Sequence, residues 1–369
     1  MIKKIALFLL IICLQSCHYG RMIRYYKADI DDHKIFPYTE VNTGTDTFYF
    51  EDGSTTDAAK KLDTLHFSVK GQRYLMDKVL DDYSETTAFL VIKDDAIVFE
   101  KYYEGYKRDS ISNIFSVSKS VTSLLVGIAI DEGKIESVQD PITKYIPELN
   151  EADPLFKKLT LEHLLDMRAG LEFDESYSSP FDEVSRLYYG KKQLKQISNM
   201  TFNHEPGAHH EYQSVCTTLL GIAVERVTGM QLGKYLEAKL WIPLEMENPA
   251  TWSYDDEKNK NTKAFCCLNT TAIDLAKIAR LMIHKGEYNG KQIVSKQWIE
   301  RLVTPNKENG YYQYQWYSTE DNSEDFFALG ILGQQVYVSP REDLIIVRLG
   351  KSWTSNNVFI SRIKEVLQE

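Results

Sequence analysis

A polar stretch followed by an apolar run organises the middle of this sequence. Residues 112–123 are mostly small and polar, residues 124–130 are apolar except for one glycine, and residues 131–134 read Asp-Glu-Gly-Lys. This order predicts a buried helix whose N-terminal turn carries hydroxyl groups and one lysine.

Two other regions have the alternation and the residue types of β-hairpins. Residues 87–92 and 96–103 are β-rich runs on either side of a tight turn, and they predict a hairpin just before the buried helix. Residues 328–340 alternate, turn at Ser339-Pro340 and return through residues 343–347, which predicts a second hairpin near the C-terminus.

One predicted helix between these hairpins contains His163, which could be catalytic or structural. Thr160 is placed as an N-cap, and Gly170 ends the helix. His163 is a candidate catalytic base by residue type. In an amphipathic helix we expect it to be a packed or capping residue instead.

Length and charge limit the class of protein. The 369 residues are 43% hydrophobic and 12% aromatic, enough for a large core in one domain or two closely joined domains. The formal charge of −10 argues against a nucleic-acid partner, and no basic patch with interleaved aromatic residues is present.

The N-terminus has the pattern of an export signal. Residues 1–4 contain two lysines, and residues 5–14 form an apolar run, long enough for a signal peptide and too short to span a bilayer. The following Leu14-Gln15-Ser16-Cys17 resembles a bacterial lipobox, with cleavage after residue 16 and a lipid on Cys17. The alternative is an ordinary signal with an incidental cysteine. Residues 17–82 are then predicted to be a tether and a small N-terminal extension.

Cysteine and histidine spacing predicts neither a disulfide framework nor a metal site. Beyond Cys17, only Cys216, Cys266 and Cys267 remain, and the adjacent pair would form a strained bridge at best. No histidine is spaced with these cysteines as zinc ligands would be.

Ser116 and Lys119 are the candidate nucleophile and base. Three positions apart on a helix, their side chains share one face, and a desolvated amine can take the serine proton. The alternative is an N-capping serine beside a solvated lysine. A second Ser-x-x-Lys match at residues 361–364 is interpreted as the exposed face of a terminal helix.

Residues 115–120 and the apolar helix after them resemble the active-site helix of the serine β-lactamase and penicillin-binding-protein superfamily. The class C branch, which also holds carboxylesterases, D-amino-acid peptidases and 6-aminohexanoate-dimer hydrolases, is the more similar one. The resemblance implies an α/β (α+β) fold of the β-lactamase/transpeptidase type for residues 83–369. It combines an antiparallel sheet flanked by helices with a mostly helical lobe at about residues 135–310.

Residues 205–214 resemble the family's Tyr-x-Asn element. The resemblance gives Tyr212 the role of a proton relay between the nucleophile and the leaving group. Ser214 stands where the family has asparagine, among the substrate-binding residues. Without this context Tyr212 would be one of 23 tyrosines in an aromatic-rich chain. Residues 173–189 are expected to help shape the pocket.

In the family's Lys/His-Thr/Ser-Gly triplet, Ala328 and Leu329 stand here for the cation and the hydroxyl residue, whereas Gly330 is kept. A cation there holds a substrate carboxylate, so its loss argues against penicillins and cell-wall peptides as preferred substrates. The resemblance implies an oxyanion hole formed by the backbone N–H groups of Ser116 and Ile331. It also places Gly330 and Gln334 in the pocket.

Together these features predict an exported, lipid-anchored serine hydrolase of the bacterial cell envelope. It would act on a small ester, amide or peptide-like substrate, without a metal or other cofactor. A β-lactamase or D-Ala-directed peptidase remains an alternative. So does a non-catalytic envelope-binding lipoprotein with the same fold.

Overall fold

The computed structural model describes residues 20–21, 25, 27–177, 179, 181–320, 324–353 and 356–369. The predicted signal segment, residues 1–16, and the predicted lipidation site, Cys17, lie outside the described residues. No helix in the described part of the chain combines the length and hydropathy needed to cross a lipid bilayer.

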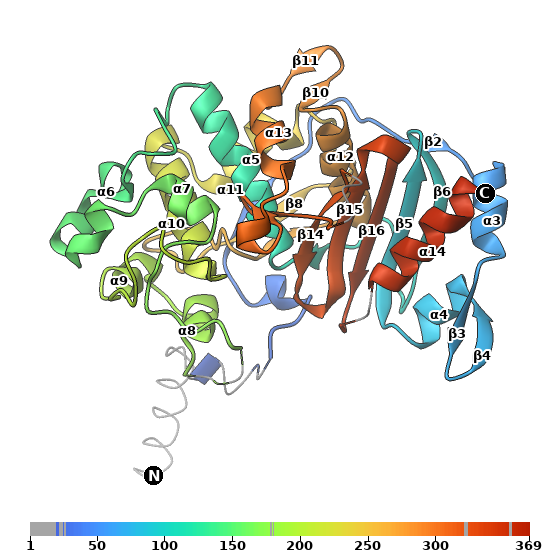
Figure 1. The fold of residues 1–369 in the computed structure, drawn as a ribbon, viewed down its shortest axis with the longest axis horizontal. Helices are drawn as coiled ribbons and strands as arrows, with labels where there is room; N and C mark the ends of the chain where they lie inside the picture. The colour runs from blue at the N-terminus through green and yellow to red at the C-terminus, as the bar shows by residue number, and fades with distance from the viewer. Residues whose placement is uncertain are drawn as a thin grey trace, which may run out of the picture.

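An eight-stranded sheet forms one side of the molecule (Figure 1), with the strand order β12-β13-β14-β15-β16-β5-β6-β2. All neighbours are antiparallel except β2 and β6, which are parallel. Both predicted hairpins are part of this sheet, and the predicted fold class is confirmed. The strands are β2 (Glu51–Asp52), β5 (Thr86–Lys93), β6 (Ala96–Tyr102), β12 (Tyr312–Gln313), β13 (Trp316–Ser318), β14 (Phe326–Gly330), β15 (Gln334–Ser339) and β16 (Leu344–Gly350).

Helices cover both faces of the sheet, which explains why residues 88–92 of β5 are all apolar. Leu90 and Ile92 point into a core shared with α5 (Val117–Asp131) and α12 (Ala272–Ile283). Phe89 and Val91 point into a second core with the helices of the opposite face. Those helices are α3 (Asp57–Asp63), α4 (Met76–Asp82) and α14 (Asn356–Gln368).

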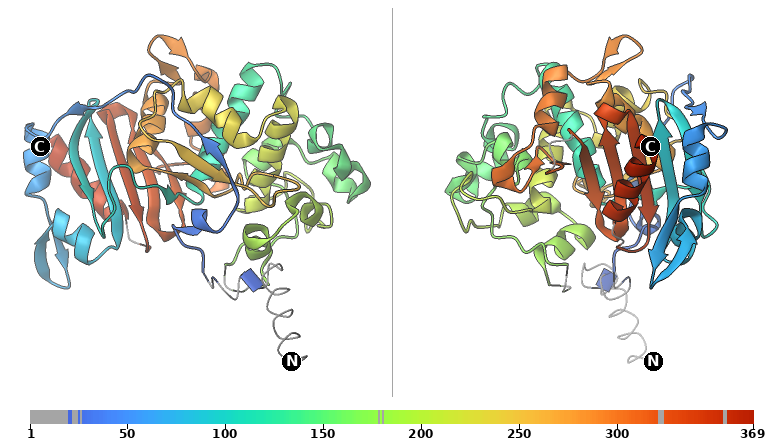
Figure 2. Two further views of the ribbon diagram at one scale, coloured as in Figure 1. Left: turned by 180° about the vertical axis from the view of Figure 1, so that it is seen from behind. Right: turned by 45° about the vertical axis from the view of Figure 1, so that its right-hand side comes forward.

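The second lobe is mostly helical, and α5 lies between it and the sheet (Figures 1 and 2). Thirteen of the fifteen residues of α5 are buried, because α10 packs on one side and β14 and β15 on the other. The remaining helices are α6 (Ile142–Tyr145), α7 (Leu161–Leu165), α8 (Glu183–Tyr189), α9 (Gln193–Ile197), α10 (Ser214–Thr228), α11 (Leu232–Leu236) and α13 (Lys296–Val303).

Two predicted boundaries differ from the structure. The helical lobe was expected to extend to about residue 310, but α12 packs on β5, β15 and β16 and so belongs to the sheet lobe. The stretch 17–82 was expected to be a tether and extension, but its described part is built into the body. In it, β1 (Tyr38–Val41) joins a four-stranded sheet, β1-β8-β9-β7, and β2 extends the large sheet. The remaining strands are β3 (His66–Val69), β4 (Gln72–Leu75), β7 (Ser112–Asn113), β8 (Ala250–Ser253), β9 (Leu268–Thr270), β10 (Glu287–Tyr288) and β11 (Lys291–Gln292).

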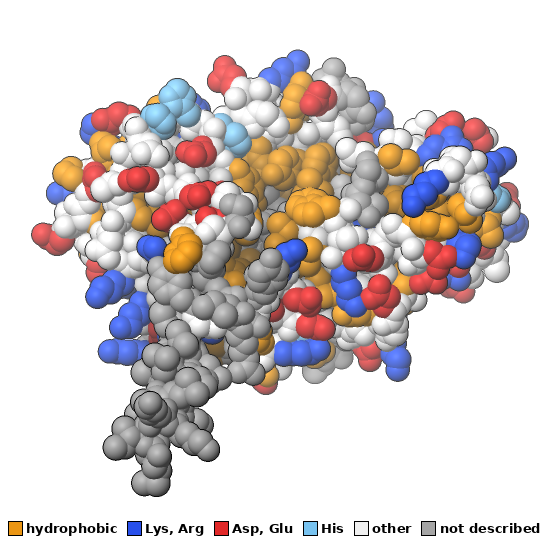
Figure 3. Space-filling view, turned by 90° about the horizontal axis from the view of Figure 1, so that it is seen from below, with side chains coloured by type: hydrophobic (Ala, Val, Ile, Leu, Met, Phe, Trp, Pro, Cys, Tyr) orange, Lys and Arg blue, Asp and Glu red, His pale blue; other side chains and the backbone are white. Residues whose placement is uncertain are grey.

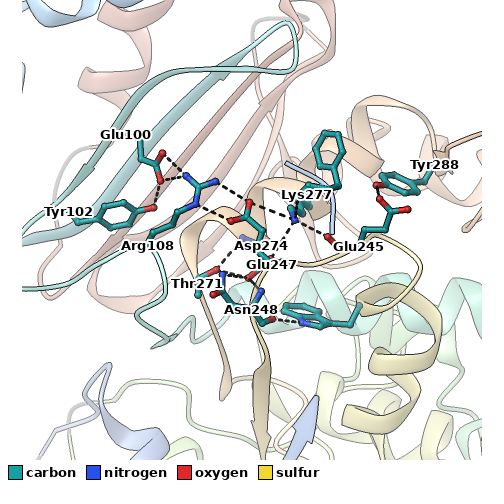
Figure 4. Close-up of polar contacts among 12 residues, drawn as sticks. Glu100, Tyr102, Arg108, Glu245, Glu247, Asn248, Thr271, Asp274, Lys277 and Tyr288 are labelled. Atoms are coloured by element: carbon teal, nitrogen blue, oxygen red, sulfur yellow. Dashed lines mark hydrogen bonds and ion pairs between the residues drawn. The ribbon is translucent and has the colours of Figure 1, made fainter. Parts of the chain in front are cut away.

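A buried cation ties this N-terminal stretch to α12 (Figure 4). The Lys277 side chain is 1% exposed and donates to the carbonyl oxygens of Phe48 (2.6 Å) and Glu245 (2.9 Å). Its Nζ lies 3.7 Å from Glu247, and Arg108 connects Glu247 to a carboxylate on β6. Burial lowers the pKa of Lys277. The network joins four segments that are distant in the sequence.

Replacement of this cation is expected to destabilise the fold. Lys277→Met removes the donor to two buried carbonyl groups and leaves Asp274 and Glu247 without it, which should cost about 3 kcal/mol in the free energy of unfolding. Urea denaturation measures this cost. Lys60→Met, which removes an exposed ion pair with Asp57, is the control and should leave the midpoint unchanged. Equal midpoints for both variants would contradict the prediction.

Candidate active site

The chain makes a sharp turn immediately before the candidate nucleophile. Phe115 has a φ of 45°, a left-handed conformation that costs a bulky residue about 1–3 kcal/mol. Its N–H donates to the Asn113 side-chain oxygen at 2.9 Å, which holds the turn. Ser116 follows as the N-cap residue of α5, partly exposed, and its hydroxyl does not cap the helix. The alternative that Ser116 is a helix-capping serine is therefore wrong.

Lys119 lies directly behind this hydroxyl. Its Nζ is 2.8 Å from Ser116 Oγ and donates to the carbonyl oxygen of Phe265 at 3.0 Å. The side chain is 1% exposed, so the alternative of a solvated lysine is wrong. Burial lowers the pKa of Lys119 to about 8, because the apolar surroundings disfavour the ammonium form. About a tenth of the amine is thus neutral at pH 7, far more than for an exposed lysine.

Tyr212 lies beside the same lysine, just before α10. Lys119 Nζ is 4.9 Å from the centre of the Tyr212 ring. Burial raises the pKa of Tyr212 well above its usual value, although a hydrogen bond with Ser116 partly opposes this shift. Tyr212 therefore stays protonated at neutral pH and can donate a proton, whereas Lys119 is the group able to accept one.

The end of β14 lies against the turn before the nucleophile. A Cβ on Gly330 would lie 2.6 Å from the carbonyl oxygen of Ile114 and 3.3 Å from Phe115 Cβ, so only glycine fits there. Ile331 follows as the first residue of a tight turn and is partly exposed. An oxyanion hole formed by the N–H groups of Ser116 and Ile331 stays a prediction.

Gln334 does not lie where the sequence analysis expected it. Its side chain is buried, with Nε2 donating to the carbonyl oxygen of Gly350 (2.7 Å) and Oε1 accepting from the Gly350 N–H (3.1 Å). Both ends of the amide are used to hold the start of β15 to the end of β16. Gln334 supports the turn after Gly330 from behind and is not part of the pocket surface.

Ser214 is buried, and its interactions point to a residue that the sequence analysis did not single out. Its N–H and hydroxyl donate to the two carboxylate oxygens of Glu175, at 2.7 and 2.5 Å. Glu175 is partly exposed and also accepts from the Tyr177 hydroxyl at 2.7 Å. The acidic and aromatic content of residues 173–189 was the available signal, but it did not distinguish Glu175 from its acidic neighbours.

Two other candidates are structural residues, as the sequence analysis expected. His163 forms a reciprocal capping box with Thr160. Ser361 donates to the carbonyl oxygen of Asn357 along α14, and Lys364 pairs with Glu342 at 3.1 Å. The second Ser-x-x-Lys motif therefore has no nucleophile–base pair.

The cysteines form one bridge, between the two neighbours that the sequence left as a possible pair. Cys266 and Cys267 form a disulfide between adjacent residues, and Cys216 is a buried free thiol. The Cys267 N–H donates to Asn113 Oδ1 at 3.1 Å, so the bridged segment is attached to the turn before the nucleophile. Within the described residues, no group of three or more His, Cys, Asp or Glu side chains could hold a metal ion.

The mostly antiparallel sheet, the helical lobe and the Ser-x-x-Lys pair at the start of the helix between them define the architecture of β-lactamase-type hydrolases. A family model described as "Beta-lactamase" matches residues 76–368. The chain belongs to the β-lactamase family, and the predicted resemblance is confirmed.

Individual relatives agree with this assignment. The chain is 31% identical over 293 residues to a 6-aminohexanoate-dimer hydrolase of Paenarthrobacter ureafaciens, covering 73% of each protein. A solved structure named "Putative 6-aminohexanoate-dimer hydrolase from Bacillus anthracis" superposes with a TM-score of 0.79 at 23% identity, covering 92% of this chain and 91% of that one. A penicillin-binding protein from Bacillus halodurans shares the fold, with a TM-score of 0.63 at 17% identity, covering 79% and 99%.

The charge of Glu175 should set the pH at which Ser116 becomes reactive. Glu175 favours the ammonium form of Lys119, so Glu175→Gln should lower the Lys119 pKa below about 8. Because only the neutral amine accepts a proton, reactivity rises with pH, and this rise should move to lower pH in the variant. The measurement is the fluorophosphonate inactivation rate against pH.

Glu172→Gln is the matched control for this experiment. Glu172 is an exposed acid of the same loop, and its carboxylate accepts from Thr201. An unshifted profile in Glu175→Gln, or the same shift in the control, would show that Glu175 does not act on Lys119.

Proposed function

We propose that this chain is a serine hydrolase that cleaves an ester or amide bond through an acyl-enzyme on Ser116. The observation that carries the proposal is the 2.8 Å contact between Ser116 Oγ and the buried Lys119 amine. A serine hydroxyl is a weak nucleophile until an adjacent base takes its proton, and a desolvated amine is such a base. Burial and the lowered pKa support this role for Lys119.

The proposed reaction proceeds in two steps. Ser116 Oγ attacks the substrate carbonyl carbon, Lys119 takes the hydroxyl proton, and Tyr212 passes a proton to the departing alcohol or amine. The N–H groups of Ser116 and Ile331 would stabilise the oxyanion, worth about 3 kcal/mol per donor. Water then attacks the acyl-enzyme, and the products are a carboxylic acid and the free alcohol or amine.

The residues around Gly330 favour a substrate without a free carboxylate at the usual penicillin position. Ala328 is buried and pairs with Val336, so it offers no charge to a ligand. The named activity of the Paenarthrobacter relative supports amide hydrolysis by this branch of the family. We therefore place simple esters and amides before β-lactams as substrates.

Covalent labelling tests the nucleophile. Intact mass spectrometry should find one fluorophosphonate adduct on the wild type and none on Ser116→Ala. Lys119→Met should slow labelling by about 10²–10⁴-fold, the usual contribution of a general base. Ser361→Ala is the matched control, since that serine belongs to the other Ser-x-x-Lys match, and it should label as the wild type does.

The same assay separates the alternatives. If penicillin acylates the protein as fast as an ester does, whether the adduct is stable or is hydrolysed, the better assignment is a β-lactamase or D-Ala-directed peptidase. A folded wild type that takes up neither reagent would leave the non-catalytic binding protein as the better interpretation.

We further propose that the protein is exported and anchored to the bacterial envelope by a lipid on Cys17. The support is the sequence around the lipobox-like residues 14–17. Cells grown with an alkyne fatty acid should yield labelled protein that lacks residues 1–16, and Cys17→Ser should abolish the label. Label that persists in Cys17→Ser would place the lipid elsewhere, and unlabelled wild type would favour an ordinary signal peptide.

A further inference from the structure

The folded body begins very close to the proposed anchor. Gly20, three residues after Cys17, is already buried, and Tyr25 packs against the main hydrophobic core. Three extended residues span at most about 11 Å. A lipid on Cys17 would therefore hold the adjoining face of the body directly at the bilayer, with no long tether between them.

This face is also the active-site end of the large sheet. Gly330 and Gly350 end β14 and β16 there, whereas the β5–β6 turn at Asp94 and Asp95 lies at the opposite end. The first described residues, drawn in blue, lie at the lower edge in Figure 1, the edge at which β14 and β16 end. Seen from below, this side is hollowed between the lobes, and hydrophobic side chains gather in the hollow (Figure 3).

Aromatic side chains project from the same end. Trp353 is 67% exposed and follows Ser352, whose carbonyl oxygen accepts from the arginine that also binds Gly333. Phe181 is 66% exposed and Tyr177 42% exposed, both in the loop that leads from Glu175 to α8. Tryptophan and tyrosine favour the boundary between water and hydrocarbon, because each has an apolar ring and a polar atom.

Charge alone would not bring this protein to a membrane. The formal charge is −10, and removal of the two lysines of residues 1–16 makes it −12. Contact with a phospholipid surface must therefore depend on the anchor and on aromatic side chains that enter the headgroup layer.

We propose that the face bearing Trp353, Phe181 and Tyr177 rests on the phospholipid bilayer, with Trp353 at headgroup depth and the hollow beside the active site opening toward the membrane. This inference rests on the proposed anchor at Cys17. It adds the orientation of the folded body relative to the membrane, which follows neither from the anchor nor from the hydrolase assignment.

The distribution of tryptophan provides a specific probe. Of the five tryptophans, Trp241, Trp252, Trp298 and Trp316 are buried, and Trp353 alone is exposed. The acylated mature protein is incorporated into phosphatidylcholine vesicles whose acyl chains carry bromine near the headgroups. Bromine quenches indole fluorescence at short range, so the loss of fluorescence relative to unbrominated vesicles reports on Trp353.

Two variants complete the design. Trp353→Phe should abolish the bromine-dependent loss. Trp353→Phe combined with Tyr49→Trp moves the exposed indole to a residue that is 66% exposed beside β2, at the opposite end of the sheet. This double variant should show no quenching, although its indole is as exposed as the original one.

Each outcome of the quenching experiment either supports the proposed orientation or overturns it. Quenching in the wild type that is lost in both variants supports it. Protein that floats with the vesicles without quenching, or quenching that persists in either variant, overturns the orientation. Protein that does not float overturns it together with the anchor. Fluorophosphonate labelling of Ser116 in the same samples tests the hydrolase assignment separately, because it does not depend on the position of the membrane.

Discussion

The exclusion of water from Lys119 is the constraint on which the rest of this structure depends. An exposed lysine would remain protonated at neutral pH and could not accept the Ser116 proton. An ammonium group removed from water is costly, so burial lowers the pKa and makes the neutral amine easier to form. The lysine must therefore be enclosed on all sides while the serine, one turn earlier, still reaches the surface.

The architecture supplies that enclosure by burying α5 except for its last two residues. The sheet covers one side through β14 and β15, and α10 covers the other. The bridged segment completes the cover at the first turn, where Phe265 accepts from Lys119 and Cys267 donates to Asn113. Groups from four distant parts of the sequence thus converge on one helix start, and the proposed chemistry would need both lobes in contact.

The sequence predicted the parts of this arrangement that are encoded locally. Ser116 and Lys119 share a helix face by spacing alone, and Gly330 could be aligned because the hairpin pattern around it is clear. Glu175 could not be identified, because its partner Ser214 is 39 residues away and loop conformation is not periodic. The prediction that Gln334 lines the pocket was wrong, because sequence does not show whether the first residue of a strand faces the core or the cleft. The stretch 17–82 is polar in composition, yet its described part pairs with strands more than 40 residues later, which composition does not reveal.

A buried arginine fixes the turn that follows Gly330, close to Ala328, where the resemblance led us to expect a cation. Arg348 is 1% exposed, and its guanidinium donates to the carbonyl oxygens of Gly333 and Ser84. Burial lowers the pKa of Arg348 to about 10, so it remains charged at neutral pH. With Gln334, this buried arginine fixes the turn that follows Gly330 from the side away from the nucleophile. The backbone geometry at Ile331 is thus maintained by contacts that do not involve the side chain of residue 328.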